Sequence, residues 1–164
     1  MERAFPDPMG DERAVLTGWL DWGRATVRRK VEGLSDGDGY RALIPTSPKM
    51  TVAGVVSHLR HTERGWFAAS FPSAVPGDGA PDPQGGWGPD RRTLTDLLEA
   101  YEAECTLSRR VIADLDLGAL QEFTPPQFTP VTVRWILAHM VEETARHVGH
   151  LDLLREQLDD ARGY

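Results

Sequence analysis

Apolar side chains recur every three to four residues along four long segments of the chain, which is the spacing of an amphipathic helix. The segments run over about residues 11–31, 51–71, 93–115 and 131–158. Stretches that contain proline and glycine separate them, and these residues interrupt helices. No segment alternates apolar and polar residues as a half-buried strand does. The pattern therefore predicts an all-α protein whose four helices form a bundle.

Residues at the ends of the segments support these boundaries. Asp11, Thr51 and Thr93 can each accept a hydrogen bond from the free amides of a first helical turn. Gly33 follows the first segment, where a left-handed residue often ends a helix, and Pro72 ends the second. The apolar stripe predicted to face the core from the first helix is Val15, Leu16, Trp19, Leu20, Trp22 and Val27.

A long connection, residues 72–92, joins the second and third helices and carries one large apolar residue, Trp87. Connections of this length without regular structure are uncommon in compact domains and are often mobile or functional. The chain has 164 residues, a typical size for one domain. We expect residues 1–164 to form that domain, with loosely ordered tails at 1–10 and 159–164.

Composition and charge narrow the class of protein. The formal net charge is −7 and the arginines and lysines are scattered among more numerous carboxylates, which argues against binding to nucleic acid or to an anionic membrane. No apolar run approaches the ~20 residues that span a bilayer. Cys105 is the single cysteine, so no disulfide can form within the chain. We therefore expect a cytoplasmic protein.

Five histidines lie in two groups, one on the second helix and one on the fourth. Helical bundles build metal sites from side chains on facing helices, so such groups with nearby carboxylates suggest a metal site. An isolated helical histidine is more often solvated or hydrogen-bonded, and spacing alone does not exclude that reading. The two groups are His58 and His61, then His139, His147 and His150.

The spacing on the fourth helix selects among the candidates. Side chains three or four residues apart can share an ion, which leaves the pairs His139/Glu143, Glu143/His147 and His147/His150. At ~100° per residue, His147 and Glu143 fall about 40° and 80° from the apolar centre of this helix, whereas His150 and His139 fall farther out. A site inside the bundle therefore favours Glu143 with His147. His139 and His150 become groups that support a ligand or lie at the surface.

The second helix is less informative. His58 falls about 120–130° from the apolar centre of that helix, so periodicity alone does not select it. Glu63 lies close to the same centre and would need a partner there, because an unpaired buried carboxylate is costly. Arg155 or a metal-binding histidine could serve as that partner. Alternatively, Glu63 reaches solvent at the end of the helix.

Two segments, VVSHLRHTERGWF and WILAHMVEETARHVGHLDLLRE, resemble the second-helix and fourth-helix motifs of the DinB-like superfamily. Together with LDWGRATVRRKVEGL and YEAECTLSRRVIADLDL, they resemble a branch that is common in actinobacteria and related to mycothiol-dependent enzymes. The resemblance covers about residues 11–158 and implies a bundle of the up-down-down-up type. It also implies a divalent metal held by three side chains, which match His58, Glu143 and His147.

The resemblance further implies a metal-dependent S-transferase or isomerase that uses mycothiol or a similar small thiol. Two imidazoles and a carboxylate leave open a coordination position that a thiol could enter. Zinc is the first candidate, with nickel, iron and manganese as alternatives. The related maleylpyruvate isomerases carry a further C-terminal domain, whereas this sequence ends at Tyr164, so we do not expect that particular reaction.

Other interpretations stay open. The bundle could bind a metal or small molecule without turnover, or it could be a dimerising structural bundle whose histidines lie at the surface. Homodimerisation is also implied by the resemblance. Cys105 could be proposed as a nucleophile, but its place in the apolar stripe of the third helix favours simple core packing.

Overall fold

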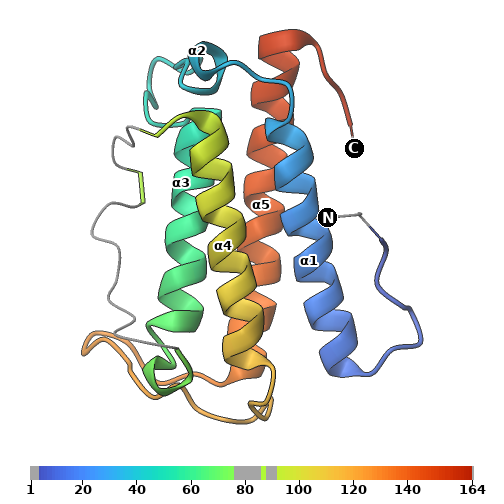
Figure 1. Ribbon diagram of the computed structural model, residues 1–164, viewed down its shortest axis with the longest axis vertical. Helices are drawn as coiled ribbons and strands as arrows, with labels where there is room; N and C mark the ends of the chain where they lie inside the picture. The colour runs from blue at the N-terminus through green and yellow to red at the C-terminus, as the bar shows by residue number, and fades with distance from the viewer. Residues whose placement is uncertain (1–3, 76–85, 88–91, 164) are drawn as a thin grey trace.

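Four long helices lie side by side along the length of the molecule (Figure 1). The computed structural model describes residues 4–75, 86–87 and 92–163. The first and last long helices run in one direction and the two middle ones run in the other, which gives the up-down-down-up arrangement. The predicted all-α bundle is therefore confirmed. The long helices are α1 (Glu12–Val31), α3 (Val52–Glu63), α4 (Leu94–Ile112) and α5 (Val133–Asp159).

The helices pack in a ring in which α1 contacts α5, α5 contacts α3, α3 contacts α4 and α4 contacts α1. A short helix, α2 (Asp36–Gly39), lies over one end of the bundle between α1 and α3. Among the helices that the structure describes, none combines the length and the apolar character needed to cross a bilayer.

The predicted helix ends agree closely with the structure. Gly33 has a φ of 82°, the left-handed conformation expected just beyond α1. The third helix ends at Ile112, slightly before the predicted Leu115. The N-terminus of each long helix is capped by a side-chain oxygen that accepts a backbone N–H; these caps are Asp11, Thr51, Thr93 and Thr132, of which the last was not predicted.

The second segment differs from the prediction. Its regular α-helix ends at Glu63 rather than Phe71 and continues as a π-helical turn, η1 (Arg64–Ala68). The amide of Ala69 donates to the carbonyl of Arg64 at 2.9 Å, a bond that spans five residues and widens the turn. A wide turn keeps the chain helical, so the periodicity of apolar residues does not indicate it. A 3-10 turn, η2 (Pro72–Ala74), follows.

A layer of polar side chains divides the core into two apolar clusters. The cluster nearer α2 includes Val27, Val55, Leu59, Leu151 and Leu154. The cluster nearer η1 includes Leu20, Phe67, Ile136, Leu137 and Met140. On each long helix at least one buried polar residue lies in sequence between members of the two clusters; these residues include Arg24, Glu63, Ser108 and Thr144.

Arg24 and Glu63 form a two-pronged ion pair inside this layer. Nε of Arg24 donates to Oε1 of Glu63 at 2.8 Å, and Nη2 donates to Oε2 at 2.6 Å. Of the alternatives left open for Glu63, the structure shows a buried carboxylate with a partner, and that partner is Arg24 rather than Arg155 or a histidine. Arg155 instead binds Asp159, its neighbour one turn later. The face of α1 was also partly misassigned, because Arg24 is buried whereas Trp19 is 42% exposed.

Candidate metal centre

His58 of α3 lies opposite Glu143 and His147 of α5. One ligand atom of each side chain, an imidazole nitrogen or a carboxylate oxygen, lies within 4.8 Å of those of the other two. Glu143 and His147 are buried, and His58 is partly buried. The arrangement follows from the fold, because two residues one turn apart share the face of α5 that packs against α3.

Hydrogen bonds fix the orientation of these side chains. Nε2 of His58 and Oε1 of Glu143 are 2.8 Å apart. Nδ1 of His147 donates to the backbone carbonyl of Glu143 at 2.8 Å. This second bond assigns the ring proton of a neutral His147 to Nδ1, which leaves the Nε2 lone pair available to a metal.

The surroundings favour the protonation states that a metal requires. Burial alone would raise the pKa of Glu143, but the hydrogen bond from His58 and the electrostatic interactions with His147, His58 and Arg146 outweigh it and lower this pKa. Burial lowers the pKa of His147, an effect that the hydrogen bond to the Glu143 carbonyl opposes only in part. An ionised carboxylate beside a neutral imidazole is the form in which both groups bind metals.

Trp87 covers the centre from the connection between α3 and α4. Its ring stacks on the His58 imidazole, with the centroids 4.6 Å apart and the planes at 18°. It lies 5.7 Å from the His147 ring. The sequence marked Trp87 as the one large apolar residue of this connection, but no spacing rule could relate it to His58. The remainder of the predicted loop includes residues 76–85 and 88–91, which lie outside the described residues.

The other candidate residues take different places. The rings of His150 and His147 meet edge to face, with their centroids 5.1 Å apart. The buried Nδ1 of His150 has no hydrogen-bond partner among the described residues. His139 lies between two tryptophans, and Glu63 is held by Arg24. The structure thus brings together the three side chains that the sequence analysis favoured. That they bind a metal stays a prediction.

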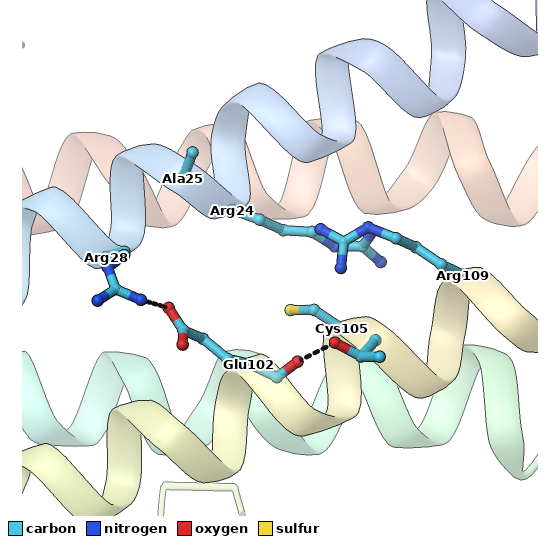
Figure 2. A pocket seen from close by; sticks show the side chains of 7 residues that line it. Arg24, Ala25, Arg28, Glu102, Cys105 and Arg109 are labelled. Carbon is cyan, nitrogen blue, oxygen red and sulfur yellow. Dashed lines mark hydrogen bonds and ion pairs between the residues drawn. The ribbon is translucent and has the colours of Figure 1, made fainter. Parts of the chain in front are cut away.

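Cys105 lies elsewhere, at a cavity of about 210 Å³ between α1 and α4 (Figure 2). Burial raises the pKa of its thiol well above the ordinary value. The guanidinium of Arg28 that also lines this cavity is paired with Glu102. Cys105 is a member of the apolar cluster nearer α2, so it packs in the core as expected.

Comparison with known proteins identifies the family. A family model described as Mycothiol-S-transferase matches residues 15–160. The chain belongs to the mycothiol S-transferase family. The matched range contains nearly all of the four long helices and all three residues of the candidate metal centre. No curated protein matches the chain at a significant level.

Proposed function

We propose that this protein is a metal-dependent thiol S-transferase that uses mycothiol or a similar small thiol. His58, Glu143 and His147 would hold the divalent cation. The observation that carries the proposal is the convergence of these three donors within 4.8 Å in a member of the mycothiol S-transferase family. Zinc is the first candidate, and nickel, iron or manganese also suits two imidazoles and a carboxylate.

The donor set fits a catalytic rather than a purely structural ion, because three protein ligands leave a position for a further group. A bound cation would hold an incoming thiol as the thiolate, although a free thiol with a pKa near ~8.5 is mostly protonated at neutral pH. His147 is oriented for this task by its Nδ1 bond to the Glu143 carbonyl. His150, in contact with His147, is placed to support that ring or to move a proton.

The reaction that follows is a displacement. The thiolate sulfur attacks an electrophilic carbon, a sulfur–carbon bond forms, and the bond from that carbon to its leaving group breaks. The leaving group departs with the bonding electron pair, and the proton of the thiol passes to solvent. His58, Glu143 and His147 would be engaged as ligands of the cation, so none of them would be free to act as the general base.

Metal content tests the first half of the proposal. Protein purified without a histidine tag should contain about one divalent ion per chain, and His58→Ala, Glu143→Ala and His147→Ala should each lose most of it. His61→Ala is the matched control, because His61 lies one turn from His58 but is exposed and is not among the three clustered residues. Full metal content in all three variants would reject the site.

Turnover tests the second half. The metal-loaded protein should conjugate mycothiol to monochlorobimane faster than the thiol reacts alone, and Glu143→Ala should remove the acceleration. Metal binding without acceleration on any of several electrophiles would reject the transferase and leave a metal-binding bundle.

We also propose that residues 1–164 act as one domain in the cytoplasm, where small thiols are kept reduced. Homodimerisation remains a prediction, and light scattering on the purified protein tests it by measuring a mass twice that of the 18.2 kDa chain.

A further inference from the structure

Two rows of side chains face each other across the groove between α3 and α5. Residues four apart lie on the same side of a helix, so each row follows its helix along the groove. The row on α3 and η1 is His58, Thr62 and Trp66, and the row on α5 is Trp135, His139, Glu143 and His147.

Contacts at both ends of the groove show that the rows are in register. At one end, His58 is bonded to Glu143 at 2.8 Å. At the other end, the Trp66 ring lies 5.4 Å from the Trp135 ring and 4.8 Å from the His139 ring. His139 therefore occupies the next turn of α5 between the candidate metal centre and a pair of tryptophans.

A cavity of about 460 Å³ opens at the tryptophan end of the groove. Its walls are mainly apolar and include Trp66, Phe128, Val131 and Trp135, with His61 among the residues that line it. The volume falls within the range of pockets that hold small organic ligands. Trp135 is 47% exposed and Phe128 is 60% exposed, so large aromatic surfaces remain open to a ligand.

The wide turn η1 helps to build this pocket. Ser70, which follows the turn, accepts hydrogen bonds at its carbonyl oxygen from the amides of Glu122 and Phe123, at 2.9 and 3.2 Å. These bonds attach the connection between α4 and α5 to the end of η1, so that both segments contribute walls to one cavity. Wide helical turns of this kind are frequent at functional sites.

We propose that this pocket binds the apolar, planar part of the electrophilic co-substrate, an inference that rests on the proposed transferase function. Aromatic walls favour a flat apolar group that can stack on them. A thiol such as mycothiol carries many sugar hydroxyls, which need polar partners. The exposed walls of the pocket are mainly apolar, and the Gln121 amide nitrogen already donates to the Phe123 carbonyl and the Thr124 hydroxyl. The Oε1 of Gln121 has no hydrogen-bond partner among the described residues, so the pocket keeps one acceptor for a polar edge of the ligand.

The geometry also limits the shape of the electrophile. Glu143 and Trp135 are eight residues apart on α5, about 12 Å along the axis. A suitable molecule extends from the pocket toward His58, with its reactive carbon at that end.

For monochlorobimane, the thiolate sulfur forms a bond to the chloromethyl carbon, chloride departs with the electron pair of the carbon–chlorine bond, and the thiol proton passes to solvent.

Binding of an unreactive probe tests the pocket without turnover. The probe is the bimane in which a methyl group replaces the chloromethyl group, and its fluorescence anisotropy is measured with the metal-loaded protein. Trp135→Ala and Phe128→Ala should each raise the dissociation constant about tenfold by removing a stacking surface. Trp19→Ala is the matched control, because Trp19 is similarly exposed, at 42%, but lies on α1 outside the pocket.

Steady-state kinetics assign the occupant. The two pocket variants should raise KM for monochlorobimane about tenfold and leave KM for mycothiol and the metal content unchanged. Unchanged probe binding in both variants, or a rise in KM for mycothiol alone, would overturn the assignment. If wild-type protein binds the probe in this pocket but shows no turnover, the proposed transferase function fails while the pocket remains an apolar ligand site.

Discussion

Arg24 and Glu63 place opposite charges at the centre of the bundle, where water cannot solvate them. Each is nearly inaccessible, with exposures of 5% and 1%, and each satisfies the other through two hydrogen bonds. Removing one partner of such a pair leaves an uncompensated buried charge, which costs far more than the pair itself contributes.

We expect Glu63→Gln to lower the free energy of unfolding by about 3 kcal/mol, because the Arg24 guanidinium loses its buried counter-charge and keeps only the partly exposed Asp21 carboxylate, which Nη1 contacts at 2.8 Å. Urea denaturation followed by circular dichroism measures the change. Glu12→Gln is the control, since it removes a carboxylate from the exposed ion pair with Arg134 and should change stability little. Equal effects of the two substitutions would contradict this account of the core.

Cys105 should be inert in the folded protein. Burial raises the pKa of its thiol, so the reactive thiolate is scarce at pH 8. We expect a thiol reagent such as iodoacetamide to modify Cys105 only after denaturation, as mass spectrometry would show. Cys105→Ala should retain the proposed transferase activity. Rapid modification of the native protein would mean that the thiol is reactive, and it would favour Cys105 as a nucleophile.

At the scale of residues, helical spacing located two of the three residues of the candidate site. Glu143 and His147 could be chosen because both the one-turn spacing and the direction of the apolar face lie within one helix. His58 could not be chosen in this way, since its role depends on how α3 is rotated against α5. Arg24 was missed for a related reason, because a charged residue becomes an acceptable core residue only when its partner on another helix is known.

At the scale of elements, α3 begins in a close turn that only glycine fits. A Cβ at Gly54 would lie 2.1 Å from the backbone carbonyl oxygen of Lys49. The amide of Gly54 also donates to the capping Thr51 hydroxyl at 2.9 Å, so the start of α3 cannot shift without losing its cap. His58 lies on the same helix, one turn beyond Gly54.

Gly54→Ala should therefore destabilise the protein by about 1–3 kcal/mol through overpacking. Gly149→Ala is the matched substitution on α5, where a Cβ would meet nothing within 4 Å. It should raise the free energy of unfolding by about 0.5–1 kcal/mol, because alanine favours an exposed helical position over glycine. Thermal or urea unfolding compares the stabilities of the two variants. A Gly54→Ala variant more stable than the Gly149→Ala variant would contradict the close contact at Gly54.

The periodicity of apolar residues predicted all four long helices, and capping side chains predicted most of their N-termini. Helical spacing is repeated many times within each segment, so single exceptions do not obscure it. The wide turn η1 was not predicted, since it leaves the chain helical and changes only the hydrogen-bond pattern. The four-residue helix α2 is too short to show any period.

At the scale of the whole molecule, the antiparallel packing of α3 on α5 creates the candidate metal centre. A cation bound by both helices would cross-link them in the folded state only. A ligand that binds only the folded state raises stability by mass action, by about 2.7 kcal/mol when its free concentration is one hundred times its dissociation constant.

We therefore expect a chelator to lower the Tm of the wild-type protein and added zinc to restore it. Glu143→Ala should show a Tm that neither treatment changes, because it lacks one of the three proposed ligands that would join the helices. Differential scanning calorimetry of both proteins makes the comparison. A wild-type Tm unaffected by chelation would indicate that no metal contributes to the fold.

Anomalous diffraction from crystals of the zinc-loaded protein locates a bound ion without reference to activity. We expect one strong peak between α3 and α5, about 2.0–2.2 Å from Nε2 of His58, a carboxylate oxygen of Glu143 and Nε2 of His147. A peak bound instead by His61 or His139, or no peak within reach of His58, Glu143 and His147, would contradict the proposed metal centre.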